Sequence, residues 1–419
     1  MIKRGWFGRL LARFTGRWHL ERLASVEEKV SKFGRAQREE LASQRQKLDA
    51  LTAAVATRAS GDAFKTMQNR LEDVHVSLAE QDRAYAETLE RNSLLDEQGV
   101  DDRRLARRVE EFLRHDRPLI VGPWTGEVGF ELLYWVPFVR RMVSVYSIPV
   151  ERLLIVSRGG VASWYGDLFN RYADVFSFFS TEEFRTLTKL KKKQRLVGEF
   201  DTEIVERVVG SYGLGRTDLL HPGMMYRLFM PVWKDLATLA RVEKYATYRK
   251  IEDENIAVPP NLPPSYVAAR FYFSECFPDT PENRAFIVST INTISQRTPV
   301  VLLNTPFAVD DHYDFDASGG HIFTIGEQYM VPEQNLAVQT AVIRRASAFV
   351  GTYGGYSYLA PFCGVPALAF YSERTFKDQH LYVAQRAFEE LGGPTVTTID
   401  VANLPLVHLA LSQRAVSDQ

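Results

Sequence analysis

Apolar residues in the first quarter of the chain recur at steps of three and four positions. The series runs Leu23, Val26, Val30, Phe33, Gln37, Leu41, Gln44, Leu48, Leu51 and Val55, and resumes after Ser60-Gly61-Asp62 at Phe64, Met67, Leu71, Val74, Leu78, Gln81 and Tyr85. Charged and amide residues surround this stripe, and all 19 prolines lie at or after Pro118. The pattern predicts a coiled coil over residues 23–98, because so narrow a stripe cannot hold a helix alone in water. The alternative is one long helix lying along the rest of the chain.

A basic amphipathic segment precedes the stripe. Residues 1–22 contain six basic side chains and one acidic side chain, Glu21. Trp6, Phe7, Leu10, Leu11, Phe14 and Trp18 fall on one side of a helical wheel. Basic helices with aromatic residues on the apolar side are typical of segments that lie in a membrane interface. We expect peripheral contact with the inner face of the cytoplasmic membrane, and packing on the protein's own body is the alternative.

From Pro118 onward, short apolar runs alternate with amphipathic stretches, which predicts βαβ units with parallel sheets. The expected strands are 119–121, 153–156, 175–179, 266–269, 299–304, 321–325, 348–350 and 367–371, and the expected helices are 130–143, 281–295, 336–345 and one that ends at Phe362. A proline-rich linker, 258–264, divides the region. The fold class is therefore α/β, with two Rossmann-like domains at 118–257 and 265–400, each with its own core, and a helix or tail at 401–419.

The net charge, the cysteine count and the length of the apolar runs exclude several classes of protein. The 419 residues carry a net charge of -1, which argues against a dedicated nucleic-acid binder. Two cysteines cannot form a disulfide framework, and no apolar run approaches the ~20 residues of a membrane-spanning helix. These features favour a cytoplasmic protein. The lysines among residues 189–193 are expected on a solvated helix face.

A glycine-rich turn between an expected strand and helix gives the strongest functional signal. It includes Thr352, Tyr353, Gly354, Gly355, Tyr356 and Ser357. Adjacent glycines let backbone N–H groups approach an anion, and the following helix directs the positive end of its dipole to the same place. Hydroxyl groups can add further donors to phosphate oxygens. The alternative is a tight turn that binds nothing.

Residues 335–371, with this turn and Gly364-Val365-Pro366-Ala367 after it, resemble the donor-binding half of GT-B glycosyltransferases, including the heptosyltransferase-like and fucosyltransferase-like groups. The resemblance implies a nucleotide-sugar donor bound at residues 352–357 and no metal. In that family a basic residue often stabilises the departing diphosphate. Arg270, at the end of the strand 266–269, is the candidate, with a surface ion pair as the alternative. Glu327 is a weaker candidate for accepting a ribose or sugar hydroxyl.

The first β–α turn of the other domain, 124–131, lacks a dinucleotide-binding fingerprint but carries two carboxylates. In GT-B folds this turn commonly contributes to acceptor binding. Glu127 is therefore the first candidate for a general base on the acceptor hydroxyl. Glu131 is the second candidate, although capping the helix or orienting a neighbour suits it better. His312 is the third.

An Asp-rich loop contains Asp310, Asp311, Asp314 and Asp316. Asp314-Phe315-Asp316 matches the D-x-D pair that holds a divalent metal in GT-A glycosyltransferases, and such loops suit hard cations. It follows the proline-rich linker, however, where GT-A topology would not place it. We expect a solvated turn there and no metal site.

Together, these features predict an enzyme that transfers a sugar from a nucleotide sugar to a glycan or glycolipid in bacterial surface-polysaccharide synthesis. Homo-oligomers would form through the coiled coil. One alternative is a non-catalytic coiled-coil scaffold with degenerate domains. The other is a nucleotide-sugar epimerase of the same architecture, which would need no amphipathic anchor.

Overall fold

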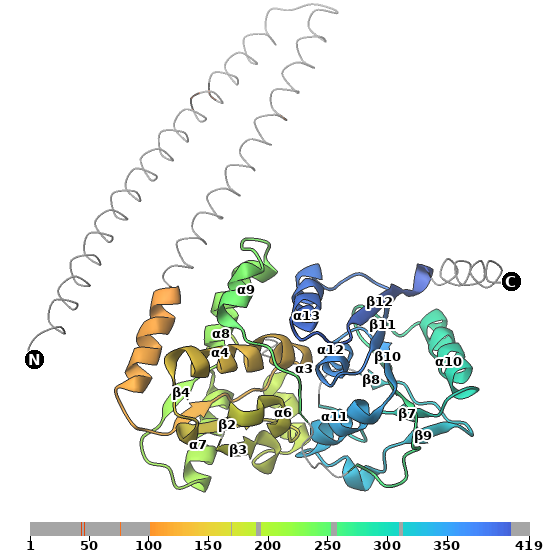
Figure 1. Ribbon diagram of the computed structural model, residues 1–419, viewed down its shortest axis with the longest axis horizontal. Coiled ribbons are helices and arrows are strands. Elements are labelled where there is room, and N and C mark those ends of the chain that lie inside the picture. Colours follow the sequence, from red (N-terminus) through yellow and green to blue (C-terminus); the bar gives the residue numbers. More distant parts are fainter. Residues whose placement is uncertain are drawn as a thin grey trace, which may run out of the picture. The chain divides into compact units, whose positions relative to one another are not determined.

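The computed structural model describes residues 101–168, 170–189, 194–252, 258–309 and 313–403, together with Ser43, Gln46 and Val76 (Figure 1). The chain divides into two units, Met1–Asn92 and Ser93–Gln419. The predicted amphipathic segment 1–22 and the tail 404–419 lie outside the described residues, as does His312. Apart from Ser43, Gln46 and Val76, so does the coiled coil 23–98. All of these stay predictions.

The first sheet is entirely parallel and has the strand order β3-β2-β1-β4. Its strands are β1 (Leu119–Val121), β2 (Leu153–Ser157), β3 (Arg171–Asp174) and β4 (Asp218–Leu220). Its helices are α3 (Val128–Phe130), the π-helix η1 (Glu131–Trp135), α4 (Val136–Tyr146), α5 (Ala162–Tyr165), α6 (Thr181–Thr188), α7 (Glu199–Ser211), α8 (Gly223–Trp233) and α9 (Ala240–Tyr245). An unlabelled helix, 101–113, precedes β1.

One expected strand of this half is wrong. Residues 175–179 were expected to be extended, but Val175–Ser177 is a 3-10 helix and β3 lies just before it. The side chain of Asp174 caps the 3-10 helix by accepting a hydrogen bond from the Phe176 N–H at 2.9 Å. Val175, Phe176 and Phe179 are buried in a cluster with α6 and α7. Their apolar character therefore reflects burial between the sheet and the helices α6 and α7, and not membership of a strand.

The second sheet is also parallel, with the order β12-β11-β10-β5-β7-β9. Its strands are β5 (Val267–Arg270), β7 (Val300–Leu302), β9 (Ile322–Thr324), β10 (Ala348–Thr352), β11 (Ala367–Tyr371) and β12 (Val396–Asp400). Its helices are α10 (Pro281–Ser295), α11 (Asn335–Arg345), α12 (Gly355–Phe362) and α13 (Asp378–Glu390), and an antiparallel ribbon joins β6 (Tyr272–Phe273) to β8 (Tyr313–Asp314). The two parallel sheets confirm the α/β class with two Rossmann-like halves.

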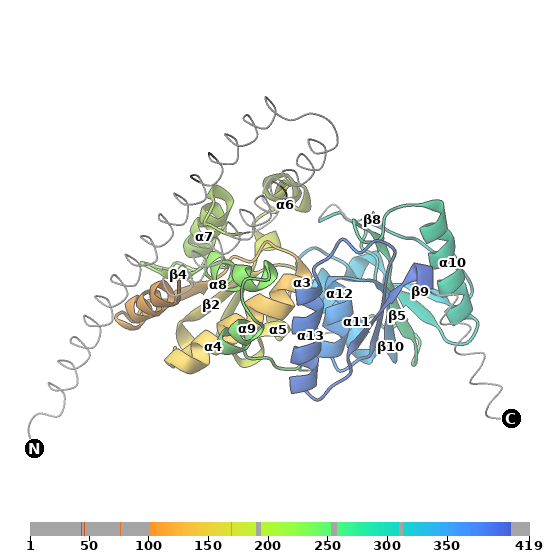
Figure 2. The same cartoon turned by 90° about the horizontal axis from the view of Figure 1, so that it is seen from above.

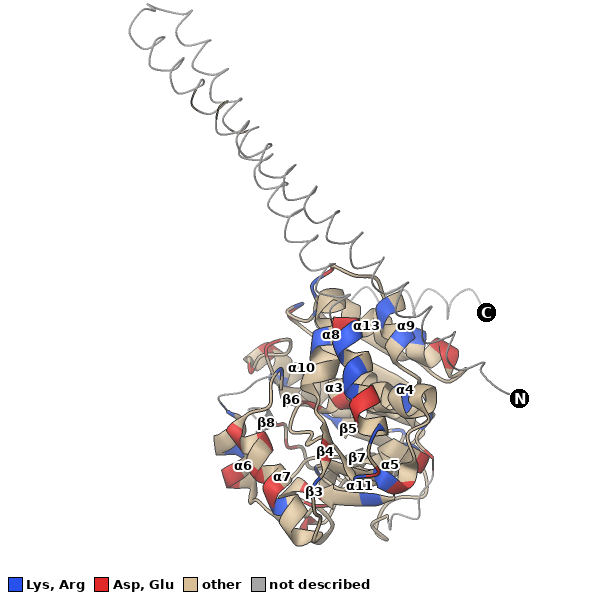
Figure 3. Cartoon of the chain, turned by 90° about the vertical axis from the view of Figure 1, so that its left-hand side faces the viewer, with Lys and Arg blue, Asp and Glu red and all other residues tan. Residues whose placement is uncertain are grey.

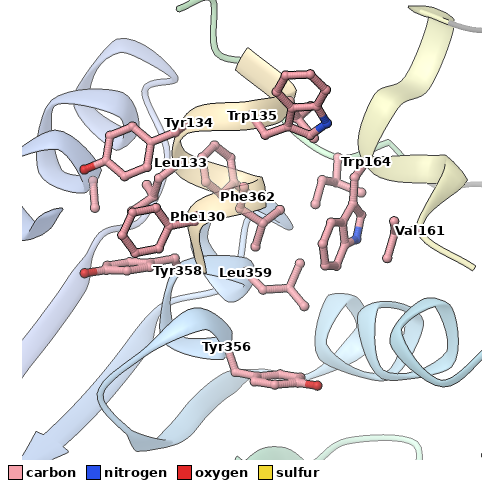
Figure 4. Close-up of a cluster of buried hydrophobic side chains, with 14 of the residues drawn as sticks. Phe130, Leu133, Tyr134, Trp135, Val161, Trp164, Tyr356, Tyr358, Leu359 and Phe362 are labelled. Atoms are coloured by element: carbon pink, nitrogen blue, oxygen red, sulfur yellow. The ribbon is translucent and has the colours of Figure 1, made fainter. Parts of the chain in front are cut away.

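A continuous hydrophobic cluster joins the two halves, whereas the sequence suggested two independent cores. Figure 4 shows Phe130 and Tyr134 of the first half lying beside Tyr358, Leu359 and Phe362 of α12. Helix α13 packs against η1 and α8, so it also bridges the halves (Figure 2). None of the helices in the described part of the chain combines the length and apolar character needed to span a membrane.

Candidate functional site

The carboxyl ends of the two sheets meet each other. The carbonyl of Gly159, after β2, accepts a hydrogen bond from the Ala337 N–H of α11 at 2.9 Å. Gly129, after β1, lies against Gly355 at the start of α12: a Cβ on Gly129 would be 3.2 Å from the Cα of Gly355. Ligands of open α/β sheets bind outside the carboxyl ends of the strands. The region where the two carboxyl edges face each other, called the crevice below, is therefore the place where a ligand is expected.

The main chain of the turn after β1 is held by hydrogen bonds from the main chain and the side chains of several segments. These are Gly122 N–H to Leu220 O (3.0 Å), Trp124 N–H to Val156 O (2.9 Å), Thr125 N–H to Gln194 Oε1 (2.9 Å), Gln194 Nε2 to Pro123 O (2.8 Å) and Arg158 Nη2 to Gly126 O (2.8 Å). Gly122 has φ +126°, and a Cβ there would lie 2.3 Å from Val156 O, so only glycine fits. The turn presents Glu127, which is exposed at the start of α3. A carboxylate on so fixed a backbone is well placed for general-base chemistry.

Glu131, four residues further on, is fully buried in η1. Its Oε1 accepts hydrogen bonds from the Ser157 hydroxyl at 2.6 Å and the Tyr165 hydroxyl at 2.8 Å. Burial raises the pKa of this carboxyl to about 7, although the two hydrogen bonds and the nearby Arg158 act in the opposite direction. Of the roles expected for Glu131, orienting its neighbours fits this placement, since its side chain faces the interior.

The buried Glu131 gives the stability of the protein a predictable pH dependence. Its pKa in the folded state, about 7, lies above the ordinary 4.5, so its contribution to stability is complete below pH 4.5 and is lost as pH rises through 7. At 1.36 kcal/mol per pH unit the loss is about 3 kcal/mol. We expect Glu131→Gln to remove this part of the decline in urea-unfolding measurements from pH 4.5 to 8. Asp174, whose pKa burial raises to about 6, should contribute to the remaining decline in both proteins. Glu206→Gln, at an exposed position of α7, should leave the decline unchanged. Equal slopes for wild type and Glu131→Gln would contradict the prediction.

The hydroxyl groups of the glycine-rich turn already have protein partners. The Thr352 hydroxyl accepts from the Tyr272 N–H at 3.0 Å and donates to the Tyr272 carbonyl at 2.9 Å. The Ser357 hydroxyl donates to the Gly354 carbonyl at 2.6 Å and accepts from its N–H at 3.2 Å. These bonds attach β6 to β10 and close the first turn of α12. Any phosphate contact at this turn would depend on main-chain N–H groups or on rearrangement of these hydroxyls.

Gly355 is required by protein packing. A Cβ at this position would lie 2.8 Å from the Gly129 nitrogen and 2.9 Å from the Val128 Cβ. The sequence argument that glycine permits a close approach is correct, but the group that approaches is the backbone of the first half. Tyr353 is buried, with its hydroxyl bonded to that of Tyr358.

Gly355→Ala should therefore destabilise the contact between the halves. Overpacking of this kind typically costs about 1–3 kcal/mol, and the rigid backbone of Gly129 cannot move aside as a side chain would. We expect a lower thermal midpoint for Gly355→Ala. Gly210→Ala is the matched control, because a Cβ at Gly210 in α7 meets nothing within 4 Å. Equal thermal midpoints for Gly355→Ala and the wild type would contradict the prediction, because the contact would then accommodate the added Cβ.

Arg270 lies at the end of β5, as expected, and its guanidinium group is engaged on two sides. Its Nε and Nη2 donate to the two carboxylate oxygens of Asp314, at 3.0 and 3.2 Å. Its guanidinium carbon lies 4.2 Å from the ring centroid of Tyr356. The side chains of Arg270 and Asp314 are 11% and 13% exposed, so the pair is mostly buried and not the surface ion pair considered above.

The expectation of a solvated turn is wrong for Asp314. This residue belongs to β8, faces Arg270 and also accepts from the Thr305 N–H at 3.1 Å. Asp316 is exposed and accepts from Asn304 Nδ2 at 2.8 Å. Within the described ranges, no group of three or more His, Cys, Asp or Glu side chains is arranged to hold a metal ion.

Three further residues belong to the description of the site: Glu327, which the sequence indicated, and Arg158 and Gln194, which it did not. Glu327 begins the 3-10 helix η5 (Glu327–Tyr329) after β9 and is exposed, close to where it was expected. Arg158 and Gln194 were missed, although both hold the Glu127 turn. Arg158 directly follows β2, and Arg270 is the last residue of β5, so the same position at the carboxyl end of a strand could have identified Arg158. Nothing in the sequence marks Gln194.

No protein-family model and no curated protein matches this chain. Among solved structures, it is similar to the iron-containing dodecameric glycosyltransferase TibC of enterotoxigenic E. coli, with 14% identity, 61% of this chain and 58% of TibC covered, and a TM-score of 0.35. A glycosyl transferase family 9 protein of Veillonella parvula has 10% identity and a TM-score of 0.37, with 71% of this chain and 89% of that protein covered. The E. coli heptosyltransferase WaaC, solved with ADP, has 12% identity and a TM-score of 0.35, with 67% of this chain and 92% of WaaC covered. The match spans less than two thirds of TibC. These neighbours are glycosyltransferases, and similarity at this level carries no argument about activity.

Proposed function

We propose that this protein is a glycosyltransferase that moves a sugar from a nucleotide-sugar donor to a glycan or glycolipid acceptor in bacterial surface-polysaccharide synthesis. The observation that carries the proposal is the meeting of two parallel sheets at their carboxyl ends, with the exposed Glu127 in the turn between β1 and α3 and Arg270 at the end of β5. Such a crevice suits a reaction between two ligands, one bound to each half.

In the proposed reaction, the acceptor hydroxyl oxygen forms a bond to the anomeric carbon of the donor sugar while the bond from that carbon to the diphosphate oxygen breaks. The hydroxyl proton passes to Glu127. The nucleoside diphosphate leaves with the bonding electron pair, and Arg270 stabilises its charge. The guanidinium fork suits this task because it can donate two parallel hydrogen bonds to phosphate oxygens. In this chain the fork already binds Asp314, so the diphosphate would share or displace that partner.

The proposal extends to the parts of the chain outside the described residues. Residues 23–98 would assemble copies of the chain, and the basic residues within 1–22 would bring the enzyme to an anionic membrane surface from the cytoplasm. Sequence patterns alone support this part. The donor-side assignment to residues 352–357 rests on the resemblance and on the position of the turn after β10, and no metal is included in the mechanism.

Thermal stabilisation by nucleotide sugars tests the proposal. Binding to the native state raises its stability by about 2.7 kcal/mol at a ligand concentration of 100 times Kd. We expect sugars of one nucleotide class, from a panel of ADP-, UDP-, GDP- and dTDP-sugars, to raise the thermal midpoint. Release of nucleoside diphosphate should then require an acceptor. Isomerised nucleotide sugar without any acceptor would indicate an epimerase, and no stabilisation by any member of the panel would support a scaffold.

A further inference from the structure

A cleft of about 490 Å³ opens between the halves, away from the residues assigned above. It lies between the end of β3 and the residues that precede α11, and its lining includes Tyr172, Asp174, Ser177, Tyr212, Glu333 and Gln334. None of its lining residues belongs to the Glu127 turn or to the cluster of Arg270, Asp314 and Tyr356. Whereas Gly129 and Gly355 pack together after β1 and β10, the crevice stays open here after β3.

The walls of the cleft are fixed by hydrogen bonds. Asp174 accepts from the Gly160 N–H at 2.8 Å, the Phe176 N–H at 2.9 Å and the Tyr172 hydroxyl at 3.0 Å. The Tyr212 hydroxyl, at the end of α7, donates to the Tyr172 carbonyl at 2.7 Å. The turn after β2, the edge strand β3 and the end of α7 are therefore joined. A cleft with such walls is preorganised, which lowers the entropic cost of binding.

The chemistry of the lining selects against anions. Asp174 and Glu333 contribute carboxylates, and no Lys, Arg or His is among the described residues that line the cleft. The neighbouring helices α6 and α7 are predominantly acidic (Figure 3). A phosphate group there would meet the like charge of these carboxylates. Arg207, which donates to the carbonyl of the lining residue Phe178 at 2.6 Å, is already paired with Glu203 at 2.6 Å. A sugar hydroxyl, by contrast, can donate to a carboxylate or to the Gln334 amide oxygen. The rings of Tyr172, Tyr212 and Phe178 add apolar faces on which a pyranose can pack.

We infer that this cleft binds an uncharged saccharide unit of the acceptor. The inference rests on the proposed glycosyl transfer, whose acceptor it assigns to the class of neutral, hydroxyl-rich sugars. The segment that follows β2 connects the cleft to the turn that carries Glu127. Gly160 lines the cleft, and Arg158, two residues earlier, donates to the carbonyl of Gly126 beside Glu127. The segment after β2 thus contributes both to the saccharide cleft and to the support of the candidate base.

Saturation-transfer NMR on the full-length protein tests the inference with neutral methyl glycosides of glucose, galactose, rhamnose and N-acetylglucosamine, compared with glucose 6-phosphate. We expect at least one neutral glycoside to bind, and to bind more tightly than the phosphorylated sugar.

Ser177→Trp places a large ring in the cleft from an exposed position and should weaken glycoside binding at least tenfold. Ser289→Trp, on the exposed face of α10, is the control. Glu333→Lys should reverse the preference toward glucose 6-phosphate, and it provides a second variant if Ser177→Trp fails to fold.

The outcomes separate this inference from the proposed function. Stabilisation by a nucleotide sugar without binding of any neutral glycoside would overturn the inference alone. Equal glycoside affinity in the wild type, Ser177→Trp and Glu333→Lys would overturn it as well, because the ligand would then lie elsewhere. Glycoside binding that Ser177→Trp removes, in a protein that no nucleotide sugar stabilises, would support the cleft and contradict the glycosyltransferase.

Discussion

Arg270→Ala is expected to lower kcat/KM for nucleotide sugar by two to three orders of magnitude. Loss of one preorganised donor to developing negative charge typically costs about 10²–10³ in rate. The guanidinium group of Arg270 is held on one edge by Asp314 and on one face by Tyr356, so it is oriented before the donor arrives. Steady-state kinetics would measure the loss of kcat/KM, and calorimetric titration with the nucleoside diphosphate would measure its affinity.

The structural role of Arg270 has to be separated from its chemical role. Arg270→Ala leaves the carboxylate of Asp314 mostly buried beside the Thr305 N–H, and an uncompensated buried charge destabilises the fold. The double variant Arg270→Ala/Asp314→Ala removes that charge and should regain thermal stability without regaining activity. Arg284→Ala is the control, because Arg284 forms a comparable pair with Asp279 on the exposed surface. If the double variant keeps wild-type nucleotide affinity, Arg270 serves folding only.

Buried central strands and a well-capped helix were predictable from the sequence. The runs at β1, β2 and β10 are almost wholly apolar, as parallel strands covered on both faces should be. Helix α10 begins at Pro281, where the sequence predicted its start, and Thr280 caps it by accepting from the Asn283 N–H at 3.2 Å.

Three of the four edge strands, β3, β4 and β12, were not predicted, whereas the edge strand β9 was. An edge strand has a neighbour on one side only and is often partly exposed, so its sequence carries fewer apolar residues. The edge strand β3, Arg171–Asp174, was therefore missed in favour of the more apolar residues that follow it. The edge strand β12, Val396–Asp400, was missed together with α13 before it.

The position of the candidate site along the strands was predictable, but the partners of its residues were not. Glu127 and Arg270 follow strands, and strand ends can be read from the sequence. Asp314 meets Arg270 across 44 residues, through a ribbon of two-residue strands that leaves no periodic pattern. Likewise, Glu131 is buried in the π-helix η1 against Ser157 and Tyr165, which lie 26 and 34 residues further along the chain, and no local pattern marks these partners.

Glu127→Gln is expected to lower kcat by two to four orders of magnitude while leaving nucleotide affinity unchanged. General-base catalysis typically contributes about 10²–10⁴-fold, and an amide cannot accept the proton of the acceptor hydroxyl. The turn that carries Glu127 is held by the main chain and by the side chains of Gln194 and Arg158, so the substitution should preserve both the turn and the thermal midpoint.

The control for Glu127→Gln is chosen by position on the sheet. Glu151 is exposed and precedes β2 at the amino end of its strand, the edge opposite to the crevice. Glu151→Gln removes the same charge from the same half and should keep wild-type turnover. If Glu127→Gln also turns over at the wild-type rate with both substrates saturating, the proton leaves through another group. The fixed turn would then serve to position the acceptor, because its anchoring bonds do not depend on the carboxylate that it presents.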